Sequence, residues 1–257
     1  MKRAERILIP LGKALAVAAF WLAVWAFAAR RVDLPLLLPS PGDVFRTLWK
    51  LLGTADFYRT AGRSLGNVAL GILSAVACGT LLALLTYRLP PLRALLLPLM
   101  TVVKATPVAS FIVLALIWIG SARVPAFITF LIVLPVVWTN LDEGLSKQDH
   151  ELAEVAKVYR MSGVRRLRYL LLPTVRPYFL SACRTSLGLA WKAGIAAEII
   201  ARPPQTIGLN MSDARVYFST EELFAWTLTV ILLSLLIEFG LVALLRKLFR
   251  NRKEVMQ

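Results

Sequence analysis

Few residues in this chain could carry out covalent chemistry, and they are scattered. His150 is the only histidine, and Cys78 and Cys183 each lie inside a long apolar run. A metal site needs clustered ligands, and triad catalysis needs a nucleophile, a histidine and a carboxylate that can meet. We therefore expect no catalytic residue and no metal site, and we expect the two cysteines to pack as small buried thiols.

Four of the charged residues that interrupt otherwise apolar stretches are Lys104, Arg184, Lys192 and Glu198. Charged side chains at membrane depth are costly and face the bundle interior or water, so these four are candidates for a translocation pathway. The three cations would suit an anionic solute. The alternative is structural: Arg184 and Lys192, eight residues apart, would pair with Glu198, Glu238 or backbone carbonyls, or extend towards the interface.

The composition indicates that a membrane protein positions these side chains. Of the 257 residues, 58% are hydrophobic and 18% are charged, whereas a soluble domain carries about 25% charge. The formal net charge of +15 would suit a nucleic-acid binder, but long uncharged runs separate the basic clusters. Positive charge that flanks apolar spans is what membrane topology requires.

The apolar runs predict an all-α integral membrane protein with six transmembrane helices in one domain, 1–257. A helix needs about 20 residues to cross about 30 Å of hydrocarbon. The expected spans are about 11–29, 64–87, 93–120, 124–141, 177–200 and 222–245. Prolines at 98, 107, 125 and 135 make the third and fourth spans irregular, which is typical either of a transport pathway or of simple kinks.

The distribution of basic residues predicts cytoplasmic N- and C-termini. With this orientation the cytoplasmic side holds 18 Lys and Arg and the opposite side holds 9, in agreement with the positive-inside rule. The exception is 30–63, where helical spacing at Val44, Leu48, Leu51 and Leu52 predicts an amphipathic segment on the outer surface. The N-terminus also resembles a signal peptide, but inner-membrane proteins with further spans commonly keep such a first helix.

One polar loop stands between the fourth and fifth spans. The spacing predicts two short amphipathic helices within 149–173, the first capped by Asp149 and the second capped by Ser162 and ended by Pro173. Such an element docks either on anionic lipid headgroups or on a soluble partner. The chain has no G-x-x-x-x-G-K-[ST] loop, so energy for pumping would come from another chain or an ion gradient.

This loop resembles the signature of the permease subunits of binding-protein-dependent ABC importers. That signature is Glu-Ala-Ala, a Gly six residues after the Glu, and an apolar-Leu-Pro ending. Here "EVA" at 154–156 and "LLLP" at 170–173 keep both ends, while Arg160 occupies the Gly position. Four blocks resemble the nitrate, sulfonate and taurine branch in order: "LLPSPGDVF" (37–45), "SLGNVALGIL" (64–73), "KATPVASFIVLALIWIG" (104–120) and "AWKAGIAAEI" (190–199).

The resemblance implies a type I importer fold in the bacterial inner membrane, usually as a homodimer. Two ATPase subunits would bind ATP and Mg inside, a substrate-binding protein would deliver a sulfonate, taurine or nitrate outside, and this chain would hold no cofactor. The loop at 149–173 would be the coupling element that sits in a groove of the ATPase. Its expected interface residues are Glu154, Ala156, Arg160, Ser162, Gly163, Arg165, Arg166 and Leu167.

Three other functions are compatible with parts of this pattern. A gradient-driven secondary transporter or channel would often show internal repeats, and none is convincing here. A membrane-embedded enzyme would need a catalytic constellation that the sequence does not offer. An ABC permease for a thiamine-type pyrimidine or another non-anionic solute would share the signature but not the preference for anions.

Overall fold

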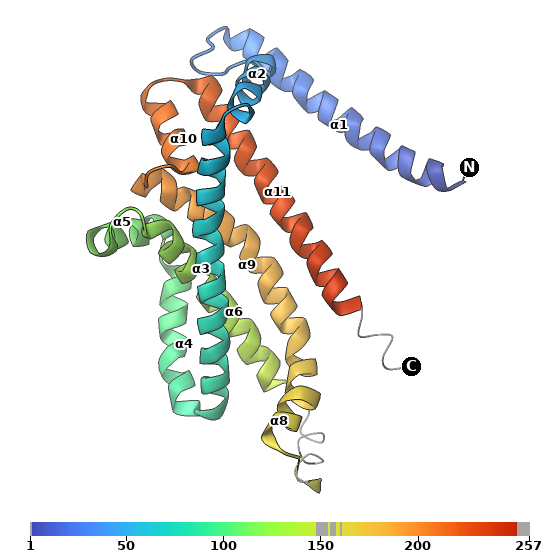
Figure 1. The fold of residues 1–257 in the computed structure, drawn as a ribbon, viewed down its shortest axis with the longest axis vertical. Helices are drawn as coiled ribbons and strands as arrows, with labels where there is room; N and C mark the ends of the chain where they lie inside the picture. The colour runs from blue at the N-terminus through green and yellow to red at the C-terminus, as the bar shows by residue number, and fades with distance from the viewer. Residues whose placement is uncertain (1, 148–153, 155–157, 160, 251–257) are drawn as a thin grey trace. The chain divides into compact units, whose positions relative to one another are not determined.

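The computed structural model describes residues 2–147, 154, 158–159 and 161–250, with side chains described outside 2–15, 164, 166–168 and 241–250. Every regular element within these residues is helical (Figure 1). The all-α fold class predicted from the apolar runs is therefore confirmed. The chain divides into two compact units, which we describe separately.

The first unit comprises Met1–Arg59 and Asn210–Val230. It holds α1 (Lys2–Val32), α2 (Pro41–Leu52), the start of α3 (Ala55–Arg88), and parts of α10 (Ile207–Val216) and α11 (Thr220–Arg250). Ser40 caps α2 by accepting a hydrogen bond from the backbone N–H of Asp43, and Pro41 occupies the first turn. Val44 and Leu48 are buried, whereas Trp49 is exposed. The helix predicted within 30–63 from this spacing is confirmed.

The second unit comprises Thr60–Leu209 and Ile231–Gln257. Its helices are α3 from Thr60 onwards, α4 (Pro90–Ala105), α5 (Val108–Ile119), α6 (Val124–Ser146), α8 (Gly163–Arg166), the π-helical turn η1 (Leu167–Leu171) and α9 (Leu172–Ala201). It also holds the start of α10, up to Leu209, and the part of α11 from Ile231. The packing of α6 against α9 is its most extensive helix pair. A core of small and branched side chains joins α5, α6 and α9: Ile112, Ala115, Val124, Ile128, Ala193, Ala197 and Ala201.

Glycines allow α3, α6 and α9 to approach closely. A Cβ at Gly71 of α3 would lie 2.5 Å from the Cβ of Thr129 and 2.6 Å from the carbonyl oxygen of Ala126, both on α6. A Cβ at Gly194 of α9 would lie 2.6 Å from Cγ2 of Val68 on α3. Real carbon atoms cannot approach so closely, and small residues at helix contacts are typical of membrane proteins.

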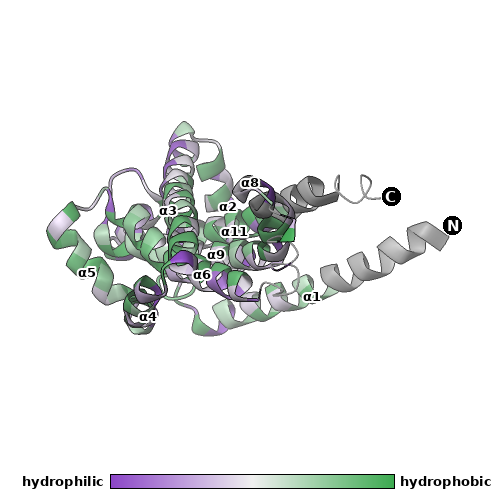
Figure 2. Cartoon of the chain, turned by 90° about the horizontal axis from the view of Figure 1, so that it is seen from below, coloured by the Kyte–Doolittle hydropathy of each residue, from purple (hydrophilic) through white to green (hydrophobic). Residues whose placement is uncertain are grey.

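Three helices are individually long and apolar enough to cross a membrane: Ala55–Arg88, Val124–Ser146 and, within α11, Thr220–Gly240. The pair α4 and α5 would make a fourth if it forms one span. Figure 2 shows hydrophobic residues over most of α5 and much of α3 and α4. With α1 and α9 the count would reach the six helices that we predict from the sequence.

The third span differs from its prediction. We expected one helix over 93–120, but α4 and α5 meet at an angle of 104°. Thr106 is extended, with ψ at 132°, and Pro107 is the residue before α5, with ψ at 131°. Proline lacks a backbone N–H and disfavours helical geometry in the residue before it, which explains the break at this point.

The junction of the polar loop with the fifth span also differs. The prediction that Pro173 ends the second loop helix is wrong, because helical backbone continues from Gly163 through η1 into α9. Pro173 lies in the first turn of α9, directly after η1. Helix α9 therefore begins at Leu172, ahead of the predicted 177, and contains Pro177.

Candidate functional site

Glu198 of α9 is the centre of a buried polar cluster in the second unit. Its side chain has no solvent exposure. Oε2 accepts hydrogen bonds from the Ser64 hydroxyl (2.7 Å) and the Gly208 backbone N–H (3.2 Å), and Oε1 accepts one from the Asn67 amide (3.3 Å). Ser64 Oγ in turn accepts from the backbone N–H of Ile207 at 2.9 Å. The carboxylate therefore links α3, α9 and the first turn of α10.

The first turn of α10 suits this carboxylate. Unpaired backbone N–H groups at a helix N-terminus favour a negative charge. A Cβ at Gly208 would clash with the Cβ of Glu198, so only glycine permits this approach. The predicted alternative that Glu198 pairs with Arg184 or Lys192 is not seen among the described residues, because its partners are neutral donors. Its place in a translocation pathway stays a prediction.

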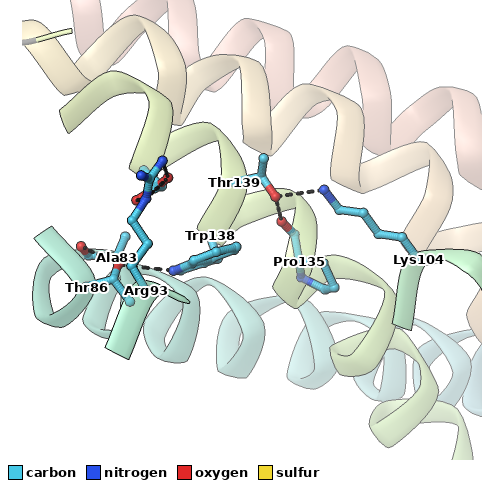
Figure 3. Close-up of polar contacts among 8 residues, drawn as sticks. Ala83, Thr86, Arg93, Lys104, Pro135, Trp138 and Thr139 are labelled. Carbon is cyan, nitrogen blue, oxygen red and sulfur yellow. Dashed lines mark hydrogen bonds and ion pairs between the residues drawn. The ribbon is translucent and has the colours of Figure 1, made fainter. Parts of the chain in front are cut away.

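Lys104 lies in the last turn of α4, directly before the bend to α5. Its side chain is exposed, and its ammonium donates to the Thr139 hydroxyl of α6 at 2.7 Å (Figure 3). Thr139 Oγ1 donates to the carbonyl oxygen of Pro135 at 2.5 Å. The Thr139 hydroxyl therefore orients the Lys104 ammonium beside the break between α4 and α5.

Arg184 and Lys192 are both exposed on α9. Neither forms an ion pair within 4.0 Å among the described side chains. Arg184 lines a small pocket of about 160 Å³ together with Glu238 of α11. The structure therefore separates the four predicted residues into one buried carboxylate and three exposed cations.

An ion pair that the sequence did not suggest joins α4 to α6. Arg93 Nε donates to both carboxylate oxygens of Asp142, at 3.0 and 2.9 Å, and its Nη2 donates to Oδ2 at 2.8 Å (Figure 3). The neighbouring Trp138 indole donates to Thr86 of α3 at 3.2 Å. In the sequence, Asp142 follows the apolar part of α6, and Arg93 follows the short turn between the second and third predicted spans. An acid and a base at such positions are the one signal from which this pair could have been predicted. These contacts fix α3, α4 and α6 near the start of the polar loop.

The two helices that carry the polar loop meet at its base. A Cβ at Gly144 of α6 would lie 2.8 Å from Cδ2 of Tyr178 on α9, so the tyrosine side chain packs directly against the glycine. The Lys147 ammonium lies 5.5 Å from the same ring and 2.6 Å from the Glu143 carboxylate. That carboxylate, and after it Tyr178, raises the pKa of Lys147.

The predicted interface residues of the loop are described only in part. Glu154, Ser162, Gly163 and Arg165 are exposed. Arg166 and Leu167 have a described helical backbone only, and Ala156 and Arg160 lie outside the described residues. Helix α8 begins directly after Ser162, the predicted cap.

Comparison with known proteins identifies relatives of the whole chain. The family described as "Binding-protein-dependent transport system inner membrane component" matches residues 69–252. The chain is 24% identical over 251 residues to the taurine transport system permease protein TauC of Escherichia coli (strain K12), covering 95% of this chain and 90% of TauC.

Two further relatives have similar coverage. The putative aliphatic sulfonates transport permease protein SsuC of Bacillus subtilis (strain 168) is 25% identical over 244 residues, covering 93% of this chain and 87% of SsuC. The bicarbonate transport system permease protein CmpB of Synechococcus elongatus is 31% identical over 228 residues, covering 83% of this chain and 79% of CmpB.

Proposed function

The chain belongs to the family of binding-protein-dependent transport system inner membrane components, and from this premise we propose how it works. The resemblance that the loop signature indicated is confirmed, and the chain is a multi-pass permease subunit of an ABC importer in the inner membrane. The mechanism that we propose is supported by the packing of two helices at the base of the polar loop. There α6 and α9 pack through Gly144 and Tyr178, so a force on the loop moves both helices together.

We propose that the loop docks on a separate ATPase subunit, present in two copies, which binds ATP and Mg and carries out hydrolysis. The proposed contacts are Glu154, Ala156, Arg160, Ser162, Gly163, Arg165, Arg166 and Leu167. Exposure of Glu154, Gly163 and Arg165 supports this, because these side chains are free of this chain's own packing. The permease would pair as a homodimer, with both termini cytoplasmic and a substrate-binding protein outside.

The proposed solute is a small organic or inorganic anion such as a sulfonate, taurine or nitrate. Two relatives are named for taurine and aliphatic sulfonates, and a third for bicarbonate. Exposed cations at Lys104, Arg184 and Lys192 support an anion pathway, because a charge at membrane depth faces water or protein. Buried Glu198 would hold the walls of this pathway in place.

The docking role of the loop can be tested with Glu154→Arg combined with Gly163→Trp. A Cβ at Gly163 meets nothing within 4 Å, so the tryptophan leaves this chain's own packing intact. We expect the tagged double variant to purify from its host membranes as a monodisperse protein without Mg-ATPase activity, whereas the wild type brings ATPase activity with it. Gly62→Trp, which also has open space around its Cβ, is the matched control. Full ATPase recovery with the double variant would contradict the proposal.

A further inference from the structure

The pocket between α9 and α11 has two facing walls within the second unit. Arg184, Gly188 and Trp191 share one face of α9, because they are four and three residues apart. Ser234 and Glu238, four residues apart, line it from α11. Arg184 lies near the middle of α9, and Glu238 lies in the apolar segment of α11 that is long enough to cross a membrane. Glu238 therefore lies in a candidate membrane span, and Arg184 lies in the span predicted from the sequence at 177–200.

Two opposite charges are held apart in this pocket. No ion pair within 4.0 Å joins Arg184 to Glu238 in the described part of the chain. Space remains between the helices because a Cβ at Gly188 would meet nothing within 4 Å. The volume of about 160 Å³ would hold about five water molecules, or a solute with a handful of non-hydrogen atoms. Each charge costs about 3 kcal/mol at membrane depth. Two opposite charges that do not pair with each other therefore point to a functional role.

We propose that this pocket is a transit site for a small zwitterion that carries an oxyanion and an ammonium group on a short chain. The oxyanion meets the guanidinium of Arg184, and the ammonium meets the carboxylate of Glu238. A simple anion of the same size would be attracted by Arg184 and repelled by Glu238. The inference rests on the proposed function and narrows its solute class from small solutes with an oxyanion group to those that also carry an ammonium group, such as taurine.

Two other occupants have chemistry that fits less well. Direct pairing of Arg184 with Glu238 would close the pocket and leave no space for a solute. The headgroup of a zwitterionic lipid carries the same two charges, but headgroups lie at the ends of spanning helices, and this pocket lies near the middle of α9. Both alternatives are separate outcomes of the experiment below.

The test measures solute binding to the permease–ATPase complex in nanodiscs of phosphatidylglycerol, without zwitterionic lipid and without the binding protein. The probes are radiolabelled taurine and 2-hydroxyethanesulfonate, in which a hydroxyl replaces the ammonium. We expect the wild type to prefer taurine. Glu238→Gln should weaken taurine binding about tenfold or more, because it removes a charge-assisted contact, and should strengthen 2-hydroxyethanesulfonate binding, because it removes the repelling carboxylate. Arg184→Gln should weaken the binding of both probes.

Controls separate the site from a structural role. Arg123→Gln removes an exposed positive charge of the same unit away from the pocket and should leave the preference unchanged. Gly188→Leu fills the pocket without changing its charge and should weaken the binding of both probes. This variant tests the pocket even if Glu238→Gln fails to assemble.

Four results would overturn the proposal: no taurine binding by the wild type, an unchanged preference in Glu238→Gln, unchanged binding in Gly188→Leu, or wild-type binding by the double variant Arg184→Gln with Glu238→Gln. The last result would indicate a structural ion pair. Loss of taurine binding when phosphatidylethanolamine is added would instead assign the pocket to a lipid headgroup. Mg-ATPase activity of the same samples tests the proposed function independently. A complex that hydrolyses ATP but does not prefer the zwitterion would contradict the proposed transit site and leave the proposed function standing.

Discussion

Arg93 and Asp142 form a bidentate ion pair in which three hydrogen bonds of 2.8 to 3.0 Å join α4 to α6. The two side chains differ in environment: that of Asp142 is 10% exposed and that of Arg93 is 49% exposed. Asp142 therefore depends on its partner more than Arg93 does, since a charge left buried without a partner is costly.

This asymmetry predicts unequal effects of the two neutral variants. Because half of Arg93 is exposed, solvent screening reduces the pair to about 1 kcal/mol of stability. Arg93→Gln should cost more than that, because it leaves Asp142 unpaired, and Asp142→Asn should cost less. The melting temperature of the purified protein in detergent measures both effects. The double variant should lose less stability than the two single variants lose together. Arg46→Gln, which removes the exposed pair with Asp43 at 3.5 Å, is the control and should change nothing measurable.

The cluster around Glu198 predicts a strong effect from a distant hydroxyl. Ser64→Ala removes one donor to the carboxylate and leaves the Ile207 backbone N–H without its acceptor. We expect a loss of about 1–3 kcal/mol in the free energy of unfolding. Ser74→Ala lies on the same helix, but its hydroxyl donates only to carbonyls of its own turn, so its effect should be small. Equal melting temperatures for the two variants would show that the cluster does not stabilise the fold.

Two glycines of α3 predict opposite responses to alanine. Gly71→Ala forces a methyl group to within 2.5 Å of Thr129, which overpacks the contact with α6 and should cost about 1–3 kcal/mol or more. Gly66→Ala enters open space and should stabilise the helix by up to about 1 kcal/mol. Thermal unfolding in detergent compares them directly, and a stabilised Gly71→Ala would mean that α3 and α6 are further apart than described.

The pathway role of Lys104 can be tested by its access to water. In a background of Cys78→Ser and Cys183→Ala, we expect Lys104→Cys to react with a charged, membrane-impermeant thiol reagent in the assembled importer. Leu99→Cys on the same helix, where the side chain is 55% exposed in the single chain, should react at least about tenfold more slowly if that face meets lipid. Equal labelling rates at the two positions would argue against a pathway at Lys104.

The apolar runs predicted the helices well, because burial in lipid leaves a long uncharged stretch for each span. Local signals also placed α2, through its cap at Ser40 and its proline at the first turn. The bend at Pro107 was harder to predict, since Pro98 and Pro135 lie inside continuous helices. Each proline removes one donor, and only the surrounding packing decides whether the helix continues.

The candidate site was predictable by residue type but not by partner. Charges inside apolar runs marked Lys104, Arg184, Lys192 and Glu198 from the sequence alone. Ser64 lies 134 residues from Glu198, and no local spacing connects them. Asp142 and Arg93 are likewise 49 residues apart on different helices. Such pairs are determined by tertiary packing, which periodicity along one helix does not encode.

The bend between α4 and α5 has a consequence for the thickness of the barrier. Helix α4 has 16 residues, which at 1.5 Å per residue span about 24 Å, whereas the hydrocarbon layer is about 30 Å thick. At 104° to α4, helix α5 runs across that direction and adds almost no height. Helix α4 alone is therefore about one fifth shorter than the hydrocarbon layer is thick, and Lys104 lies in its last turn, where the direction of the chain changes.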